Sequence, residues 1–225
     1  MKTLIIAEAG VNHNGSLHIA KKLINIAAKI GVDAIKFQIY STDELATKYS
    51  KLAKYQRTNT KYKYTQYEML KKYELSNESL KKIIQYSKIK KIKFLASAFD
   101  ISSIKKLNNL KMNTFKIPSG EITNYNYLKY IGKYNKKIII SSGMSNLREI
   151  KEAINILKSS GTKKSNITVM HCTTDYPTKI IDVNLRAMLT IKEKIGVNVG
   201  YSDHTTNIEV PIAAVALGAK IIEKH

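Results

Sequence analysis

Residues 197–225 read VNVGYSDHTTNIEVPIAAVALGAKIIEKH. The apolar runs at 197–201 and 220–224 have the length of buried strands. Residues 208–217 between them form an apolar helical segment that Gly218 ends. This order predicts two parallel strands joined by a crossover helix. A histidine, His204 or His225, follows the end of each strand.

The same alternation extends back to the start of the chain. Strand-like runs occupy residues 4–8, 33–38, 93–97, 114–117, 137–141 and 167–172. Segments with helical spacing occupy residues 17–30, 65–73, 77–90, 101–110, 124–133, 146–159 and 183–195. The strands are mostly continuous apolar runs, as expected where both faces are buried. The pattern predicts an α/β fold, a closed (β/α)8 TIM barrel.

A doubly wound open sheet is the alternative fold. That fold normally has a GxGxxG phosphate turn after its first strand. Residues 9–15 read AGVNHNG, which lacks this spacing. The barrel is therefore the preferred prediction. The connection at residues 39–64 is long and polar, and loops of this length are usually functional or mobile.

The composition excludes several function classes. Of the formal charge of +21, nearly all comes from lysines spread along the chain, whereas arginine occurs only at positions 57, 148 and 186. Because base readout favours arginine, we expect no nucleic-acid partner and interpret the charge as a solvated surface that attracts anionic substrates. No apolar run approaches the ~20 residues of a membrane span. With Cys172 as the single cysteine and no room for a signal segment, a cytoplasmic location is expected.

Barrel chemistry lies at the carboxyl ends of the strands. Lys36 and Lys116 stand there in otherwise apolar strands, and lysine is rarely buried without a partner, which predicts anion binding. Ser119 and Gly120 beside Lys116 suit a phosphate or carboxylate. The other polar residues at these ends are Glu8, Gln38, Ser97, Asp100, Glu121, Ser141, Ser142, Thr173, Thr174, Tyr176, Ser202, Asp203, His204 and His225. For Glu8 alone, a salt bridge to a neighbour is an equal alternative.

Two imidazoles delivered to one pocket predict a divalent metal site at His204 and His225. The other candidates have weaker interpretations. His13 either lines the pocket or packs in its loop, and His18 is expected on a helix surface. We expect His171 in the core or wall and Cys172 as a core thiol.

Seven runs of sequence resemble the sialic acid synthase family, which includes N-acetylneuraminate, legionaminate and pseudaminate synthases. They cover the whole chain in order. The runs are IAEAGVNHNG at 6–15, KFQ at 36–38, FKIPSGE at 115–121, SGM at 142–144, HCTTDYP at 171–177, GYSDH at 200–204 and IEKH at 222–225.

The resemblance implies a barrel that condenses phosphoenolpyruvate with an N-acetylated aldose. The sugar would be N-acetylmannosamine or 2,4-diacetamido-2,4,6-trideoxymannose, and the products a nine-carbon 2-keto sugar acid and phosphate. It implies Mn²⁺ or Mg²⁺ at His204 and His225, where the metal can polarise the sugar aldehyde. The phosphoenolpyruvate-binding positions would be Lys36, Lys116, Ser119, Thr174 and Ser202.

The implied positions around the sugar and the reacting carbons are Glu8, Gln38, Glu121 and Tyr176. Among the carboxylates, Glu121 is the first and Glu8 the second choice to stabilise the cation at C2 or to accept the proton of water. The sequence departs from the family at Ala96-Ser97-Ala98-Phe99, where Ser-Thr-Pro-Phe is usual, and at Lys179, where a second proline is common.

The family also has a further helix, an aspartate after the last strand, and a C-terminal antifreeze-like domain that contributes an arginine to the partner site in a homodimer. Because residues 1–225 contain none of these, we expect them to be the synthase barrel of a longer chain. A missing helix uncovers ~400–500 Å² of apolar sheet, or at most ~10 kcal/mol. Since this matches the whole net stability of a domain, ~5–15 kcal/mol, we expect the stretch alone to be poorly stable and inactive.

Two other functions compete with the synthase. A degenerate barrel kept as a binding or assembly module is one, and absence of Mn²⁺ affinity would favour it. Another phosphoenolpyruvate aldol synthase, acting on arabinose phosphate or erythrose phosphate, is the second. Phosphate release with a sugar phosphate, and none with an N-acetylmannosamine-type sugar, would favour this second alternative.

Overall fold

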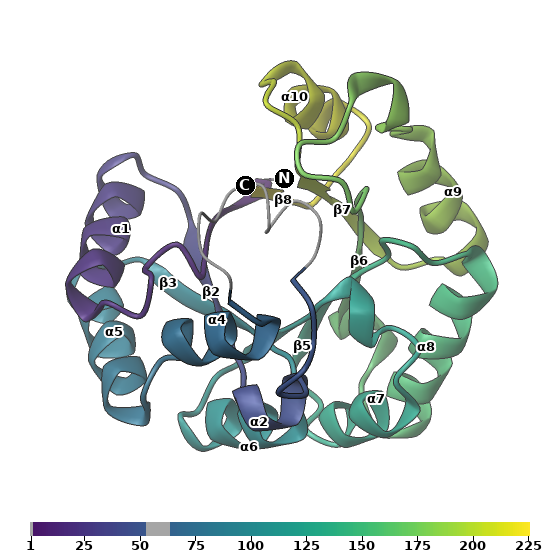
Figure 1. The fold of residues 1–225 in the computed structure, drawn as a ribbon. Helices are drawn as coiled ribbons and strands as arrows, with labels where there is room; N and C mark the ends of the chain where they lie inside the picture. The colour runs from purple at the N-terminus through teal and green to yellow at the C-terminus, as the bar shows by residue number, and fades with distance from the viewer. Residues whose placement is uncertain (1, 53–63) are drawn as a thin grey trace.

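The computed structural model describes residues 2–52 and 64–225, which form a closed barrel of parallel strands in sequential order (Figure 1). The strands are β1 (Leu4–Gly10), β2 (Ala34–Ile39), β3 (Lys93–Ala98), β4 (Thr114–Ile117), β5 (Lys137–Ser141), β6 (Ile167–His171), β7 (Asn198–Asp203) and β8 (Ile221–Lys224). β8 pairs with β1 and closes the ring. The predicted barrel is confirmed, and the open sheet is excluded.

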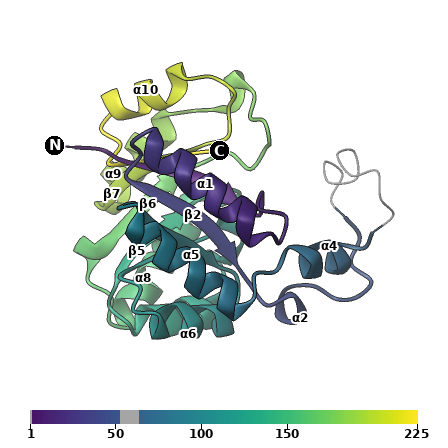
Figure 2. The ribbon, with the colours of Figure 1, turned by 90° about the vertical axis from the view of Figure 1, so that its left-hand side faces the viewer.

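Helices surround the barrel on its outer face, apart from two short ones that lie past the carboxyl ends of the strands (Figure 1 and Figure 2). They are α1 (Leu17–Lys29), α2 (Thr42–Leu45), α4 (Gln66–Tyr73), α5 (Asn77–Ile89), α6 (Ile101–Asn109), α7 (Tyr125–Gly132), α8 (Leu147–Ser159), α9 (Arg186–Ile195) and α10 (Glu209–Ala216), with short 3₁₀ turns η1 (Ser119–Glu121), η2 (Lys164–Asn166) and η3 (Ile180–Asp182). Side-chain caps fix several starts; at α8, Asn146 and Glu149 form a capping box. α9 begins three residues later than the predicted helix because η3 and a turn precede it.

The barrel interior changes from apolar to polar along its axis. Ile6, Ala34, Leu95, Ile139, Met170 and Ile221 form an apolar plug inside the strands. Toward the carboxyl ends, register pairs place polar residues on neighbouring strands: Glu8 beside Lys36, and Ser202 beside Glu223. Because paired residues in parallel strands point to the same side, these polar groups form one layer above the plug.

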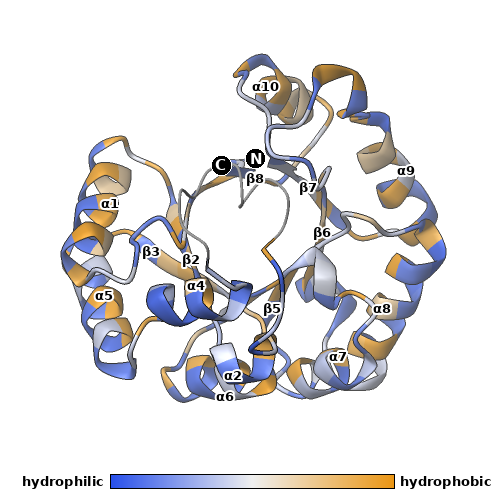
Figure 3. Ribbon diagram, in the orientation of Figure 1, coloured by the Kyte–Doolittle hydropathy of each residue, from blue (hydrophilic) through white to orange (hydrophobic). Residues whose placement is uncertain are grey.

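No helix follows β8 within the described residues, and α10 is the helix that packs against this strand, where Ile222 is 3% exposed. A wide gap separates α10 from α1 in the ring (Figure 1). An apolar groove lies there, lined by Ile5, Ile208, Pro211, Ile212, Val215, Ile222 and Lys224. α10 itself is apolar on several faces (Figure 3), and Ile212 is 65% exposed. Among the described residues, β8 is the last element of the barrel.

The polar connection predicted at residues 39–64 contains the short helix α2, whereas residues 53–63 lie outside the described part of the chain. α2 and α4 project past the carboxyl ends of the strands (Figure 2). Within the described residues, we find no helix that is long and apolar enough to span a membrane.

Gly200 lies where β7 approaches β8 most closely. A Cβ atom at this position would lie 2.6 Å from the backbone oxygen of Ile221 and 3.0 Å from its Cβ. Since backbone cannot move aside cheaply, we expect Gly200→Ala to lower the free energy of unfolding by roughly 1–3 kcal/mol. Urea denaturation measures this change. Gly120→Ala is the matched control because its Cβ would meet nothing within 4 Å; equal midpoints for both variants would refute the prediction.

Candidate active site

A pocket of about 400 Å³ opens at the carboxyl ends of the strands. The predicted site residues that line it are Lys36, Gln38, Lys116, Ser119, Thr174, Tyr176, Ser202, His204 and His225. Glu8 and Glu121 are not among the lining residues. The barrel therefore brings together positions that are up to 189 residues apart in the sequence, from Lys36 to His225.

The floor of this pocket is a buried cluster of alternating charges. Lys36 Nζ lies 2.7 Å from Glu8 Oε2 and 3.6 Å from Glu223 Oε2. Lys116 Nζ donates to Glu223 Oε1 at 3.2 Å. All four side chains are at most 4% exposed. Because two carboxylates balance two ammonium groups, the cluster has no net charge when all four are ionised.

The carboxyl groups of Glu8 and Glu223 have pKa values that are shifted in opposite directions. Burial, together with the nearby charge of Glu223, raises the pKa of Glu8 above its usual value, although Lys36 and His225 act in the opposite direction. Burial alone would also raise the pKa of Glu223, but Lys116, Lys36 and His225 together hold that pKa well below its usual range. Burial opposes the charge of Lys36, yet Glu223 and Glu8 raise the pKa of this lysine. Glu223 is therefore the more firmly ionised carboxylate.

Sequence reasoning missed Glu223. Its carboxylate accepts hydrogen bonds from Lys116 and, at 3.0 Å, from the hydroxyl of Ser202. Its Oε2 atom accepts none within the described residues. A signal was present: Glu223 interrupts an apolar strand two residues before His225, so the two side chains share a face of that strand.

The two predicted metal ligands lie side by side in the structure. The rings of His204 and His225 have centroids 4.3 Å apart and cross at 82°. His204 Nδ1 bonds to the backbone carbonyl of Thr173, so this nitrogen holds the proton and Nε2 keeps its lone pair. Burial, with the nearby His225, lowers the pKa of His204 to about 4, which keeps the ring neutral. The ring of Tyr176 stacks on His204 at 4.1 Å.

These features fit a divalent metal. A neutral imidazole whose other nitrogen is held by a carbonyl is the usual form of a metal-binding histidine. Within the described residues, no group of three or more His, Cys, Asp or Glu side chains could enclose an ion. A metal held by His204 and His225 would therefore keep most of its coordination sphere open for water and substrate oxygens.

Glu121, the first choice for the catalytic carboxylate, lies in η1 beside the pocket. Its Oε2 accepts a hydrogen bond of 2.7 Å from the side chain of Asn124, the N-cap of α7. The neighbouring Ser119 does line the pocket, and its Oγ accepts from the backbone N–H of Gly143 at 3.2 Å. The Ser119 hydroxyl also lies 3.5 Å from the sulfur of Cys172, at the pocket wall.

Comparison with known proteins decides the family. The NeuB family matches residues 23–225 of this chain. The chain belongs to the NeuB family. The predicted resemblance to sialic acid synthases is confirmed at this level.

Two relatives and one solved structure place the chain within the NeuB family. It is 52% identical to the N,N'-diacetyllegionaminic acid synthase of Campylobacter jejuni, covering 100% of this chain and 67% of the relative. It is 44% identical to the synthase of the same name from Legionella pneumophila, covering 100% and 64%. The crystal structure of N-acetylneuraminic acid synthetase from Leptospira borgpetersenii, in complex with citrate, matches with a TM-score of 0.85 and 35% identity over 100% of this chain and 73% of that one. The chain thus spans about two thirds of the curated relatives.

The other histidines and Cys172 pack against, or hydrogen-bond to, neighbouring protein groups, except His18, which is exposed. His13 is fully buried, accepts from the N–H of Gly15 and packs against Phe37 at a centroid distance of 5.9 Å, so it packs in its loop. His18 is exposed on α1, as predicted. His171 Nε2 bonds to the carbonyl of Val183 at 2.8 Å. Buried Cys172 lies 3.5 Å from the hydroxyl of Ser119 and lines the pocket wall.

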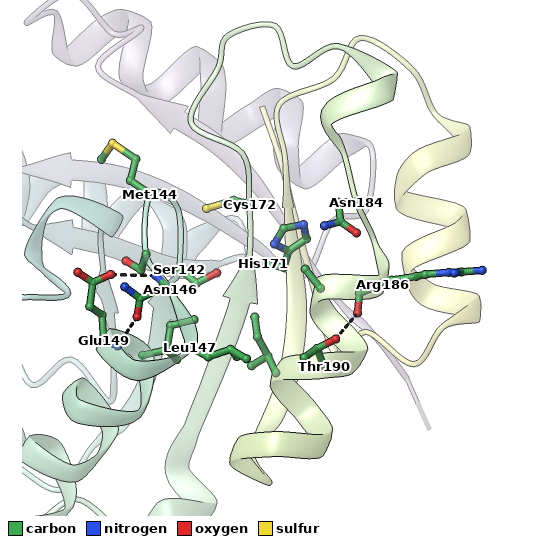
Figure 4. Close-up of a pocket in the computed structure, with 14 residues that line it drawn as sticks. Ser142, Met144, Asn146, Leu147, Glu149, His171, Cys172, Asn184, Arg186 and Thr190 are labelled. Carbon is green, nitrogen blue, oxygen red and sulfur yellow. Dashed lines mark hydrogen bonds between the residues drawn. The ribbon is translucent and has the colours of Figure 1, made fainter.

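A second, larger cavity of about 720 Å³ lies between α8 and α9 (Figure 4). Several of its polar side chains form hydrogen bonds within α8 or α9. Asn146 and Glu149 cap α8, and the Thr190 hydroxyl donates to the carbonyl of Arg186 at 3.2 Å. The buried charges and the imidazole pair belong to the smaller pocket, so we place the chemistry there.

Proposed function

We propose that this protein condenses phosphoenolpyruvate with an N-acetylated aldose to give a nine-carbon 2-keto sugar acid and phosphate. One observation supports this most strongly: two buried lysines and two adjacent imidazoles line the same pocket. Lysines buried at a strand end suit a substrate with several negative charges. Phosphoenolpyruvate has both a carboxylate and a phosphate.

The pocket floor binds phosphoenolpyruvate in this proposal. Lys36 and Lys116 neutralise its anionic groups, and their present partners Glu8 and Glu223 hold the ammonium groups in place. Ser119, Thr174 and Ser202 line the same pocket. Ser119 and Thr174 can offer hydroxyl donors to phosphate or carboxylate oxygens, and Ser202 can do so once its hydroxyl turns away from Glu223.

His204 and His225 would hold the divalent metal, Mn²⁺ or Mg²⁺. When bound, the metal supplies Lewis acidity for the sugar aldehyde. The chain supplies the orientation: the carbonyl of Thr173 fixes the His204 tautomer, and Tyr176 stacks on the ring. The two nitrogen ligands favour Mn²⁺ over Mg²⁺, whereas the positions left open for water and substrate oxygens suit either ion.

The reaction forms one carbon–carbon bond and breaks one carbon–oxygen bond. C3 of phosphoenolpyruvate attacks the aldehyde carbon, whose oxygen gains a proton. Water adds to C2 and loses one proton, which leaves a hydroxyl group and the phosphate on the same carbon. The C2–O bond to phosphate then breaks, the hydroxyl gives its proton to the departing phosphate, and the ketone remains. Positive charge develops at C2 before water adds, and Glu121 remains the proposed carboxylate for stabilising it. The pocket-lining carboxylate of Glu223 is a further candidate for the same role. Glu8 orients Lys36, and it accepts a proton more readily than Glu223 does because its pKa is raised and that of Glu223 is lowered.

The sugar is proposed to be 2,4-diacetamido-2,4,6-trideoxymannose. The identities of 52% and 44% with two N,N'-diacetyllegionaminic acid synthases exceed the 35% with the N-acetylneuraminic acid synthetase structure. The product would be N,N'-diacetyllegionaminic acid. We further propose a homodimeric cytoplasmic enzyme, in line with its small-molecule substrates and single cysteine.

Phosphate release tests the proposal directly. Phosphoenolpyruvate and Mn²⁺ are offered with N-acetylmannosamine or 2,4-diacetamido-2,4,6-trideoxymannose, using the full-length protein. We expect release with the diacetamido sugar, loss of release in excess EDTA and recovery on adding Mn²⁺. Silence with both sugars from a folded protein would favour the non-catalytic barrel. Release with arabinose phosphate or erythrose phosphate alone would favour the other aldol synthases.

A further inference from the structure

One side of the active-site pocket is apolar. Leu45 at the end of α2, Leu70 on α4 and Phe99 after β3 line it, and all three are half-buried. Buried Tyr40 completes this group, and Gln66 of α4 is the polar residue among them. We call Tyr40, Leu45, Gln66, Leu70 and Phe99 the α2–α4 wall. It contrasts with the charged floor formed by the two lysines and two carboxylates.

The α2–α4 wall is held in place by hydrogen bonds within the described residues. The hydroxyl of Tyr40 donates to the backbone carbonyl of Leu70 at 3.0 Å, which ties α4 to the end of β2. The hydroxyl of Thr42 donates to Glu74 at 2.7 Å, which ties α2 to the residue after α4. The apolar surface therefore exists before any ligand binds.

The wall lies across the barrel from the imidazole pair. The strands close in sequential order, so β3 stands four strands away from β7. Phe99 directly follows β3, and His204 directly follows β7. Figure 1 likewise shows α2 and α4 on the side of the ring opposite β8. A sugar whose aldehyde lies at the imidazoles therefore directs its far carbons, C4 to C6, toward the wall.

The two candidate sugars differ at those carbons. N-acetylmannosamine has hydroxyl groups at C4 and C6. The diacetamido sugar has a methyl group at C6 and an acetamido group at C4. A hydroxyl placed against leucine and phenylalanine loses its bonds to water without replacement, whereas methyl groups gain by burial. An amide can also pair with the side-chain amide of Gln66.

We propose that the α2–α4 wall is the specificity determinant that selects a 6-deoxy sugar with an acylated nitrogen at C4 over a fully hydroxylated sugar. This inference rests on the proposed synthase function and adds the residues that choose its substrate. Leu45 and Leu70 contact the far end of the sugar, and Gln66 recognises the amide.

Substituting the wall tests this inference in the full-length enzyme. Leu70→Gln introduces a polar group, and Leu70→Met is the matched control that keeps an apolar side chain of similar volume. For Leu70→Gln we expect the ratio of kcat/KM between the diacetamido sugar and N-acetylmannosamine to fall by about 10- to 100-fold, the range that small apolar contacts give. The KM for phosphoenolpyruvate is expected to stay the same. Leu70→Met is expected to keep the wild-type preference.

Leu45→Gln is the second variant, in case Leu70→Gln does not fold. An unchanged sugar ratio in a folded, active Leu45→Gln or Leu70→Gln protein overturns the inference. A fall in kcat/KM for both sugars by the same factor also overturns it, since a merely structural role gives that result. Wild-type protein that releases phosphate with neither sugar contradicts the proposed function instead, so the two failures are distinguishable.

Discussion

Replacing Lys36 with methionine is expected to slow phosphoenolpyruvate-dependent phosphate release by about 10²–10³-fold and to lower the free energy of unfolding. Lys36 is 3% exposed and lies between the carboxylates of Glu8 and Glu223. Removing a buried cation leaves its partners uncompensated, which typically costs about 3–5 kcal/mol. Losing a charged group that binds the reacting substrate typically lowers kcat/KM by about 10²–10³-fold. Urea unfolding and phosphate release measure the two effects separately.

A double variant separates the structural from the catalytic role of Lys36. Lys36→Met combined with Glu8→Gln removes the cation and the charge of its closest partner, 2.7 Å away. Since no unpaired carboxylate then remains at that contact, we expect most of the lost stability to return. Phosphate release should not return, because the substrate anion still lacks its ammonium partner. A double variant that recovers both stability and activity would show that Lys36 serves only to balance Glu8.

The barrel could be predicted because its determinants are local. Each strand is a short apolar run bounded by a helix start or a glycine, and parallel strands buried on both faces give that pattern without ambiguity of period. The need of the two lysines for negatively charged partners could also be predicted, because a charged residue in an apolar strand needs a partner wherever the strand lies. Lys36 and Lys116 both line the predicted pocket.

The partner that balances these lysines could not be read in the same way. Glu223 is 187 residues from Lys36 in the sequence, and only the closure of β8 onto β1 brings the two within 3.6 Å. The sequence showed that a negative group was required but not which one. The sequence predicts a substrate anion beside each lysine, whereas the structure provides protein carboxylates as well.

The role of Glu121 stays a prediction. The run around Lys116 predicts a carboxylate near the reacting carbons, and Glu121 lies in the same short turn as the pocket-lining residues Ser119 and Gly120. The turn η1 follows β4, and the Glu121 side chain lies against Asn124 at 2.7 Å and not among the pocket-lining residues. The α2–α4 wall depends on how α4 returns to Tyr40, a tertiary contact that helical periodicity does not contain.

Removing either imidazole of the pair is expected to remove Mn²⁺ binding. His204→Ala and His225→Ala each leave one nitrogen ligand in a region where the described residues offer no cluster of three alternative ligands. Loss of a mere outer-shell partner weakens metal affinity by roughly 10–100-fold, so loss of a ligand should exceed that range. Titration of the protein with Mn²⁺, followed by calorimetry or electron paramagnetic resonance, measures the affinity without depending on turnover.

The control is His18→Ala, because His18 is exposed on α1, away from the pocket lining. It should bind Mn²⁺ like the wild type, whereas both pocket variants should lose binding. If His204→Ala and His225→Ala bind Mn²⁺ as tightly as the wild-type protein, the metal lies elsewhere. In that case the closeness of the two rings, 4.3 Å between centroids, would have to come from their stacking with Tyr176 and from packing at the barrel mouth. Another positive group would then have to polarise the aldehyde oxygen, and we expect the pocket-lining Lys116 to do so.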